Sequence, residues 1–348
     1  MKPRVYLDWN ATAPLRPEAR AAMAAAMDVV GNPSSVHAEG RAARAIVERA
    51  RAQVAEATGC GAGEVVFTSG ATEAAALALA GRGLVGAAVE HECVAAWVEA
   101  SLPVDADGRI EVDDPARSVV QAANGETGVL QELPPGLACT DVSQAVGRVP
   151  FGFDWSGART AILAGHKAGG PKGVGALLLA PGVRAEPRLL GGGQELGRRA
   201  GTENVIGIAG FGAAVAAAAA EVAAGVWDEV AEARNILEEA LASAASTTIF
   251  VGKAARRLPN TSCVAVPGWK GETQVMQMDL AGYAVSAGSA CSSGRVRASR
   301  VLTAMGFAPE VASSAIRISI GPGTSRDEVL GFAAAWERHY QRFRARAA

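Results

Sequence analysis

The sequence lacks the features that mark several classes of protein. Its five cysteines are odd in number, widely spaced and without a C-x-x-C pair, which argues against a disulfide framework and a zinc site. No long stretch carries charge of one sign, because 33 basic and 35 acidic residues are mixed along the 348-residue chain. Neither nucleic acid nor a membrane surface is therefore an expected partner, and no metal ion is expected.

We also expect neither a long apolar run nor a secretory signal in this sequence. The first residues enter a strand-like pattern at once, and no apolar stretch is expected to span a membrane. The alanine-rich run at 213–224 is broken by Glu221 and predicts a buried helix. Together with the cysteine pattern, this favours a cytoplasmic protein that acts on a small molecule.

The chain does contain alternating helical and strand patterns. Helices are predicted at 38–58, from 71 onward and from about 207 to 245, and strands at 64–68, 87–89, 118–122, up to Asp141, 261–266 and 316–320. This alternation predicts an α/β fold with a mostly parallel central sheet, helices on both faces and a smaller α+β C-terminal domain. We expect an N-terminal segment 1–15 packing with the small domain, a large domain 16–245 and a small domain 246–348.

Lys167 is the most informative residue, because it follows a buried strand pattern within a glycine-rich segment. Loss of hydration at a strand exit lowers the pKa of a lysine, and a neutral amine can condense with the aldehyde of pyridoxal phosphate (PLP). An ordinary surface lysine in a turn is the alternative. Ligands collect at the carboxyl ends of parallel strands, where several other polar residues are expected.

Two further strand exits carry polar groups with more than one interpretation. Thr72 opens a helix after a strand, which suits a phosphate but also a plain helix cap. Asp141 suits a protonated pyridine nitrogen, although it would equally cap a helix beginning at Val142. Gln144 suits a ring hydroxyl, or completes a pattern like a capping box.

Three other residues suggest chemistry, each with a structural alternative. His91 follows a strand and is suited to stacking or proton transfer, although a lone histidine is more often structural. Cys291 lies in a loop of small residues before several arginines, which predicts a more nucleophilic thiol than that of a buried cysteine. Arg317 interrupts an apolar strand pattern, and its partner is either a substrate carboxylate or an internal carboxylate.

Taken in order, these segments resemble the cysteine desulfurases of the nitrogen-fixation and iron–sulfur-cluster assembly type, in the class V aminotransferase branch of fold type I PLP enzymes. The resemblance covers nearly the whole chain. The matching segments are 6–14, 31–37, 68–73, Asn124-Gly-Glu-Thr-Gly128, Asp141-Val-Ser-Gln144, Gly165-His-Lys167, 200–204, Ser289-Ala-Cys-Ser-Ser293 and 316–319.

The resemblance implies a PLP cofactor joined covalently to Lys167. Asp141 would pair with the ring nitrogen, Gln144 would meet the ring oxygen, and His91 would stack over the ring. Thr72 and His166 would hold the phosphate, joined by Thr202 from the neighbouring subunit of a homodimer, and Ala71 would also contact the cofactor. A serine is common in the family where this chain has Ala164, so one phosphate contact is expected to be missing.

The resemblance also implies L-cysteine as the substrate. Asn124 and Arg317 would bind its carboxylate, and Cys291 would accept its sulfur for delivery to an acceptor protein. The arginines that follow Cys291 match no family pattern and suit either thiolate activation or a solvated loop. The rival functions are selenocysteine lyase, another PLP lyase or aminotransferase, or a sulfur-transfer partner without catalysis.

Overall fold

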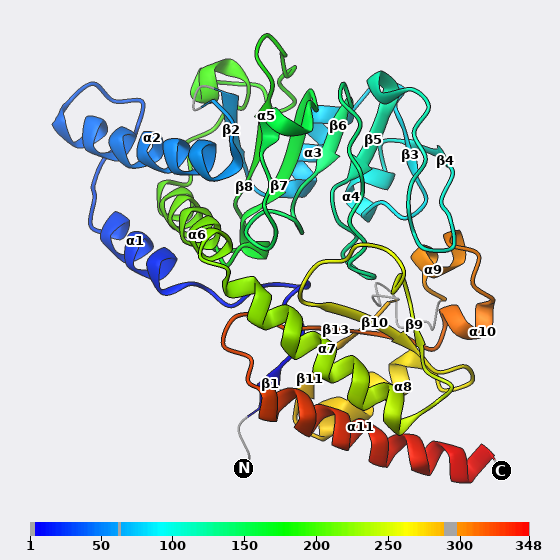
Figure 1. The fold of residues 1–348 in the computed structure, drawn as a ribbon. Coiled ribbons are helices and arrows are strands. Elements are labelled where there is room, and N and C mark those ends of the chain that lie inside the picture. The colour runs from blue at the N-terminus through cyan, green and yellow to red at the C-terminus, as the bar shows by residue number, and fades with distance from the viewer. Residues whose placement is uncertain (1–3, 62–63, 289–297, 348) are drawn as a thin grey trace.

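The computed structural model describes residues 4–61, 64–288 and 298–347 (Figure 1). Within these residues a seven-stranded sheet has the order β2-β8-β7-β6-β5-β3-β4. Its strands are β2 (Val65–Thr68), β3 (Val85–Ala87), β4 (Glu99–Leu102), β5 (Ser118–Gln121), β6 (Cys139–Asp141), β7 (Thr160–Ala164) and β8 (Gly175–Leu179). Five of them, β7, β6, β5, β3 and β4, pair in parallel, whereas β8 runs antiparallel to both β7 and β2. The predicted mostly parallel α/β sheet is confirmed.

The strand directions bring several sequence positions to one edge of the sheet. The parallel strands β3, β5, β6 and β7 have their carboxyl ends at the same edge. The end of β2 joins them, because Thr68 pairs with Gly175, which in turn pairs with Ala164 at the end of β7. The loops that follow these strands therefore converge, as the position of ligand sites in such sheets requires.

Helices cover both faces of this sheet (Figure 1). The helices of this unit are α1 (Pro17–Met27), α2 (Ala38–Thr58), α3 (Ala71–Leu79), α4 (Glu92–Ala95), α5 (Phe153–Ser156) and α6 (Val205–Ala223), of which α1 packs on α6. The ends of α2 are explained locally, because the His37 ring accepts the Gly40 N–H and Gly59 ends the helix at φ 62°. The prediction of a helix at 38–58 is confirmed.

The helical stretch predicted from 207 to 245 is two helices, α6 and α7 (Val226–Ala244). Gly225, at φ 75°, separates them, because this left-handed conformation stops the first helix. The expectation that no segment could span a membrane is also wrong by length and composition, since Val205–Ala223 is apolar enough. In the structure this helix packs against α1 and α2, and half of it is buried.

A second, smaller unit of structure follows α7. Its antiparallel sheet has the order β12-β13-β10-β9 within the described residues, and a two-stranded parallel sheet joins β1 to β11. The elements are β1 (Val5–Tyr6), β9 (Ile249–Phe250), β10 (Thr261–Ala265), α8 (Gly271–Leu280), β11 (Tyr283–Ala284), β12 (Ser286–Ala287), α9 (Arg300–Ala304), α10 (Pro309–Ala312), β13 (Ala315–Ser319) and α11 (Arg326–Ala347). The N-terminal strand thus lies beside a strand from the last quarter of the chain.

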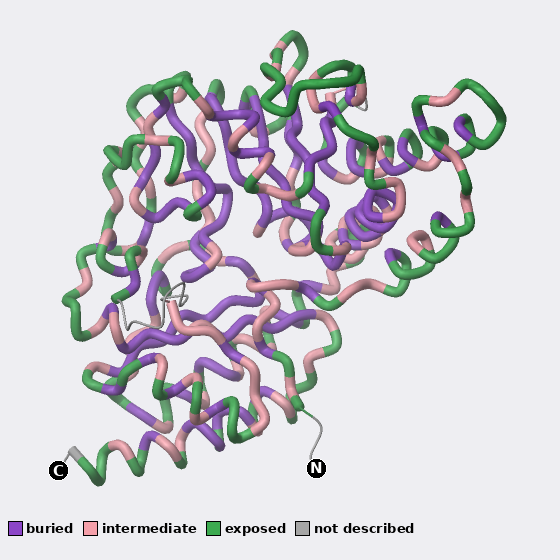
Figure 2. The backbone as a smooth tube through the Cα atoms, turned by 180° about the vertical axis from the view of Figure 1, so that it is seen from behind, coloured by how far each residue is buried: buried purple, intermediate pink, exposed green. Residues whose placement is uncertain are grey.

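Separate apolar cores support the two sheets. One face of the large sheet packs Val120 and Leu163 against Phe211 of α6, and these three side chains are buried. Beneath the small sheet, Trp336 of α11 packs with Trp269 at a ring-centroid distance of 5.3 Å. Figure 2 shows the buried strands running through the interior while exposed residues lie along the outer helices. Each core holds its sheet rigid beside the convergent loops.

Candidate active site

A cavity of about 540 Å³ lies at the carboxyl edge of the large sheet. The loops after β2, β3, β5, β6 and β7 all contribute to its wall. Seven of the residues proposed from the sequence to act at the site line the cavity, namely Ala71, Thr72, His91, Asp141, Gln144, His166 and Lys167. Residues up to 96 positions apart in the chain are thus gathered by the strand directions, because the sheet brings its carboxyl ends together.

Lys167 ends a short 3-10 turn, Gly165–Lys167, directly after β7. Its Nζ donates hydrogen bonds to the backbone oxygens of Asn10, at 2.6 Å, and Ala11, at 2.9 Å. Burial, together with the cations of Arg148 and Arg317, lowers the pKa of this amine to about 8. A substantial fraction of the amine is therefore neutral near physiological pH, as condensation with an aldehyde requires.

Asp141 ends β6, between β5 and β7, and its side chain is 8 % exposed. Its Oδ1 accepts the backbone N–H of Ser143 at 2.9 Å, and no α-helix begins at Val142 in the described chain, where residues 143–148 form turns. The helix-cap interpretation is therefore wrong. A carboxylate with a single backbone partner remains free to meet a cation at the cavity wall.

Gln144 lies in the same turns and faces the cavity. Its Nε2 donates to the backbone oxygen of Asn10 at 3.1 Å, and its Oε1 accepts from the Arg148 guanidinium. The amide is thereby oriented with its nitrogen toward the N-terminal segment. Sequence reasoning did not select Asn10, although it lies in the matching segment 6–14, or Arg148, because their contacts here join segments far apart in the chain.

His91 lies at the cavity as the N-cap of α4. Its Nδ1 accepts the backbone N–H of Cys93 at 3.2 Å, and the Cys93 thiol lies 3.0 Å from the same nitrogen. Since Nδ1 is an acceptor, the neutral ring carries its proton on Nε2. Nδ1 of His91 thus has the structural role of a helix cap. The Nε2 edge of the ring remains available for a ligand.

The start of α3 offers hydrogen-bond donors to an anion. Ser69, Gly70, Ala71 and Thr72 line the cavity, and no side chain caps this helix. The first backbone N–H groups of such a helix and its dipole favour a phosphate. The interpretation of Thr72 as a plain cap is wrong, because Gly70 occupies the N-cap position.

Two buried polar atoms at the cavity have no partner within the described residues. They are Nδ1 of His166 and Oγ1 of Thr12. Burial lowers the pKa of His166 to about 4, helped by the neighbouring cations of Lys167 and Lys172, so the ring is neutral at physiological pH. Buried polar atoms of this kind normally have a partner, which indicates that a polar ligand completes the site.

The cavity therefore fits PLP, the cofactor of class V aminotransferases. An amine able to form an imine, a carboxylate for the ring nitrogen and an uncapped helix N-terminus for a phosphate all face one space. The orphaned Nδ1 of His166 adds a group that needs a partner. Ala164, which stands where a serine is common in the family, also lines the cavity and offers no hydroxyl.

The two residues proposed to bind the substrate carboxylate lie outside the cavity lining. Asn124 is 3 % exposed, and its Oδ1 accepts the backbone N–H groups of Glu126 and Thr127. Its Nδ2 donates to the backbone oxygen of Val89 at 3.1 Å. Asn124 thus holds its own loop, and its role toward the substrate stays a prediction.

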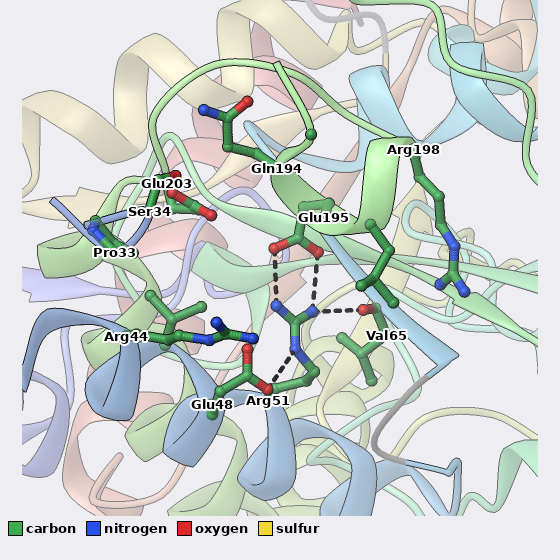
Figure 3. Close-up of a pocket in the computed structure, with 13 residues that line it drawn as sticks. Pro33, Ser34, Arg44, Glu48, Arg51, Val65, Gln194, Glu195, Arg198 and Glu203 are labelled. Atoms are coloured by element: carbon green, nitrogen blue, oxygen red, sulfur yellow. Dashed lines mark hydrogen bonds and ion pairs between the residues drawn. The ribbon is translucent and has the colours of Figure 1, made fainter. Parts of the chain in front are cut away.

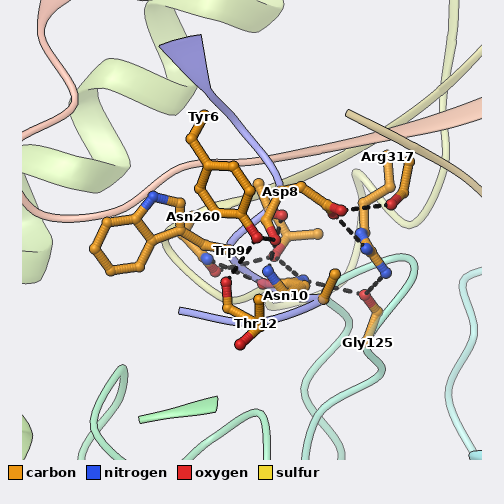
Figure 4. Close-up of polar contacts among 12 residues, drawn as sticks. Tyr6, Asp8, Trp9, Asn10, Thr12, Gly125, Asn260 and Arg317 are labelled. Atoms are coloured by element: carbon orange, nitrogen blue, oxygen red, sulfur yellow. Dashed lines mark hydrogen bonds and ion pairs between the residues drawn. The ribbon is translucent and has the colours of Figure 1, made fainter. Parts of the chain in front are cut away.

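Arg317 of β13 forms an internal ion pair, which was the alternative interpretation of this residue. Its Nη2 lies 2.6 Å from Oδ1 of Asp8, and its Nη1 donates to the backbone oxygen of Gly125 at 3.1 Å (Figure 4). The Nε atom is buried without a hydrogen-bond partner in the described structure. One donor of the guanidinium therefore remains for a further anion, beside Gly125, which lines the cavity.

Thr202 lies outside the main cavity, in a neighbouring one of about 240 Å³ that shares Ser69 and Gly173 with it. Its loop is anchored by Arg51, whose guanidinium pairs with both oxygens of Glu195 at 2.8 Å (Figure 3). Glu195 also accepts the backbone N–H of Phe67 at 2.9 Å. These contacts hold Glu195 in the left-handed backbone conformation, at φ 50°.

Cys291, Arg295 and Arg297 lie outside the described residues. Arg300, the third arginine after the cysteine, begins α9 and donates to the backbone oxygen of Glu90. Glu90 itself is a buried acid beside the site that sequence reasoning missed. An acidic residue directly before His91, at the end of a strand pattern, was the available signal.

Glu90 yields a prediction on the pH dependence of stability. Its Oε1 accepts the backbone N–H of Gln121 at 3.0 Å, and burial raises its pKa to about 8, with Asp141 adding repulsion. Because the folded state holds this proton more tightly than the unfolded state, the stability from the protonated acid is lost as pH rises from about 4.5 to 8. Glu90→Gln should therefore gain on the order of 3 kcal/mol relative to the parent between pH 5 and 8.

Denaturant unfolding at both pH values measures this gain. The exposed neighbour Glu92 provides the control, because Glu92→Gln at the surface should change stability by no more than about 0.5 kcal/mol. A parent and a Glu90→Gln variant with parallel pH profiles would show that Glu90 is ionised in the folded protein at neutral pH.

Comparison with known proteins agrees with this geometry. Residues 5–332 match the aminotransferase class-V family. A cysteine desulfurase of Cereibacter sphaeroides is 39% identical over 364 residues, 94% of this chain and 93% of that protein. The cysteine desulfurase IscS of Dictyoglomus turgidum is 34% identical over 365 residues, 94% of this chain and 92% of that protein.

Solved structures of similar fold agree with these sequence relatives. A NifS-like protein from Rickettsia africae aligns with a TM-score of 0.87 at 30% identity, covering 97% of this chain and 99% of that one. SspA in complex with cysteine aligns with a TM-score of 0.75 at 26% identity, covering 91% and 99%. The resemblance inferred from the sequence motifs is confirmed. Matched along almost its whole length and in its fold, the chain belongs to the aminotransferase class-V family.

Proposed function

We propose that the protein is a PLP-dependent cysteine desulfurase, which converts L-cysteine to L-alanine and moves the sulfur to Cys291 as a persulfide. The observation that carries this proposal is the Lys167 amine, which lies with Asp141 and the start of α3 around a single cavity. The relatives named above carry the same activity in their names. No described feature favours one of the rival functions.

The chain's own residues suit the tasks of holding this cofactor. The start of α3, with Ala71 and Thr72, and the His166 ring would hold the phosphate, and Lys167 would bind the aldehyde. Asp141 would hold a proton on the ring nitrogen, because its carboxylate favours the cationic form. When bound, PLP supplies an electron sink for the pair left at the substrate Cα. Gln144 would donate to the ring oxygen, and His91 would lie against the ring.

Proton transfer at the substrate Cα falls to Lys167. A pKa of about 8 keeps part of the amine neutral near physiological pH, so its Nζ can accept a proton and return it. The carbonyl oxygens of Asn10 and Ala11 hold Nζ beside the cavity. His91, with its proton on Nε2, is positioned at the same cavity to assist these transfers.

The sulfur acceptor is proposed by comparing the five thiols. Burial raises the pKa of Cys60, Cys93 and Cys139 to about 12, and that of Cys263 well above its ordinary value, so each is a poor nucleophile. Cys291, in its loop of small residues, is the remaining thiol. The transfer needs no oxidant. The substrate C–S bond breaks, the substrate sulfur is inserted into the S–H bond of Cys291, and the carbon that lost the sulfur gains a proton.

Substrate recognition yields a second prediction. A substrate carboxylate would meet the unpartnered Nε of Arg317, while Asp8 holds the other side of the guanidinium. Arg317→Lys keeps the charge and loses the planar fork, at a cost of about 1.5–3 kcal/mol in binding. We expect KM for L-cysteine to rise about 10- to 100-fold, with a smaller change in kcat. Steady-state kinetics measure both values, and an unchanged KM would remove Arg317 from the substrate site.

The direct test of the proposed function uses the purified holoenzyme. After incubation with L-cysteine, alanine is quantified and the persulfide is mapped by mass spectrometry. One alanine per sulfur, with the added sulfur on Cys291, is expected. Alanine without sulfur on Cys291, or pyruvate in place of alanine, would indicate a different PLP lyase.

Two aspects of assembly remain part of this proposal. We place Thr202 at the active site of the partner subunit in a homodimer, supported by its position outside its own chain's main cavity. A sulfur-acceptor protein in the cytoplasm would take the persulfide sulfur from Cys291. Sedimentation of the holoenzyme tests the dimer, and mixing subunits that carry Thr202→Ala with subunits that carry Lys167→Ala tests whether sites are shared.

A further inference from the structure

Arg148 is a buried cation behind the site to which no role has yet been assigned. Its side chain lies in the turns after β6, and the residue is 2 % exposed. The guanidinium donates only to uncharged oxygens. Nη1 bonds the backbone oxygen of Gln144 at 3.2 Å and the side-chain Oε1 of the same residue. Nη2 bonds the backbone oxygens of Trp9, at 3.3 Å, and Lys167, at 3.1 Å.

An arginine in this position is energetically unfavourable. Within the residues that the structure describes, no carboxylate forms an ion pair with Arg148, whereas the partly buried Arg51 and Arg257 each have at least one carboxylate partner. Burial, together with the cations of Arg317 and Arg16, lowers the pKa of Arg148 to about 9. An uncompensated buried charge is costly, so its presence beside Gln144 and Lys167, which line the cavity, suggests a functional requirement.

The four oxygens bound by Arg148 belong to the segments that shape the cavity. Trp9 precedes Asn10, whose backbone oxygen accepts from both Nζ of Lys167 and Nε2 of Gln144. By attracting Oε1 of Gln144, the guanidinium turns the amide nitrogen toward Asn10 and the cavity. With an apolar side chain at position 148, the Asn10 carbonyl alone would set the orientation of the amide, and Oε1 would lose its donor.

From this geometry we propose that Arg148 is a positioning residue of the cofactor site. It orients the Gln144 amide, ties the Lys167 turn to the N-terminal segment and places a positive charge behind the lysine. The inference deepens the proposed function, because it assigns a task to a residue of the same site. It concerns how the protein prepares Lys167 and Gln144, irrespective of which substrate is used.

The positive charge of Arg148 should have a measurable effect on the pKa of Lys167. Four charged groups face Lys167, of which Arg148 and Arg317 lower its pKa while Asp141 and Asp8 raise it, and burial has the largest effect. Removing the charge of Arg148 takes away one repulsion and should raise the pKa of Lys167 by about one unit. A purely structural residue would leave this pKa unchanged as long as the fold persists.

The test compares Arg148→Met with Arg148→Lys in the full-length protein. The fraction of Lys167 labelled by acetic anhydride is measured by mass spectrometry as a function of pH, after removal of PLP, with the exposed Lys270 as the internal reference. The parent should show a midpoint near pH 8. Arg148→Met should shift this midpoint upward by about one pH unit, whereas Arg148→Lys should keep it near the parental value.

A second measurement separates the orienting role from the charge. Arg148→Lys keeps the charge but cannot reach all the oxygens, so reconstituted holoenzyme should lose PLP faster on gel filtration than the parent does. An unchanged midpoint in Arg148→Met, or equal shifts in both variants, would overturn the proposal. If Arg148→Met does not fold, Arg148→Gln, which is neutral but polar, is measured in its place under the same criteria.

The outcome is distinguishable from a failure of the proposed function. Labelling needs neither L-cysteine nor turnover, so the midpoint shift can be observed even if the parent produces no alanine. In that case the desulfurase assignment fails and the role of Arg148 stands. If the parent produces alanine but the midpoint is unshifted in Arg148→Met, the desulfurase assignment stands and the proposed role of Arg148 fails.

Discussion

Lys167→Ala should lower the turnover of L-cysteine by at least about 10⁴-fold, equivalent to about 5.5 kcal/mol of barrier. The variant loses both the covalent anchor for PLP and the base that moves the Cα proton, and alanine replaces neither. The fold should persist, because Nζ bonds only the backbone oxygens of Asn10 and Ala11 and closes no ion pair in the described residues. Removing a partly buried cation also relieves a desolvation cost.

Alanine production from L-cysteine measures the turnover, and borohydride reduction followed by peptide mapping locates the covalent anchor. The parent should yield a single reduced cofactor on the peptide that contains Lys167, and the variant should yield none. Lys270→Ala, at an exposed lysine outside the cavity, serves as the matched control and should retain parental activity. Cofactor trapped on another lysine of the parent protein would contradict the assignment of the whole site.

Cys291→Ala should lower the rate of sulfur release from L-cysteine by about 1,000-fold, equivalent to about 4 kcal/mol of barrier. The variant should still bind PLP and L-cysteine, because the groups proposed to hold them lie in other segments. Without a thiolate to attack the substrate sulfur, the C–S bond has no acceptor. The visible absorbance of the holoenzyme should therefore still respond to L-cysteine while alanine accumulates only slowly.

The matched control is Cys60→Ala. Burial raises the pKa of the Cys60 thiol to about 12, and the residue lies outside the cavity. Its removal should leave sulfur release unchanged, at the cost of a small loss of stability. If Cys291→Ala released sulfur at the parental rate with dithiothreitol present, the persulfide would have to form elsewhere or not at all.

The loops that form the site could be anticipated from the sequence because of one property of parallel sheets. Lys167, Asp141 and His91 each follow a strand pattern, and parallel strands place all such positions at one edge. The prediction therefore required only the strand pattern and its direction. The helix at 38–58 was equally predictable, since its apolar periodicity and its terminal Gly59 are local signals.

Other contacts could not be predicted, because their partners are distant in the chain. Arg317 meets Asp8 across 309 positions, and Arg148 meets Trp9 across 139. Whether Arg317 had an internal or an external anion could not be decided from spacing alone. The separation of α6 from α7 depended on the backbone conformation of Gly225, which a sequence rich in alanine on both sides does not reveal.

By itself, the sequence determined the α/β alternation, the family and the groups proposed to perform chemistry, because local patterns and motif order encode these. Only the tertiary structure decided which groups share a cavity, which are committed to internal partners and how burial alters the pKa of Lys167. These properties depend on the distances between segments and on exclusion of water, and neither exists until the chain has folded.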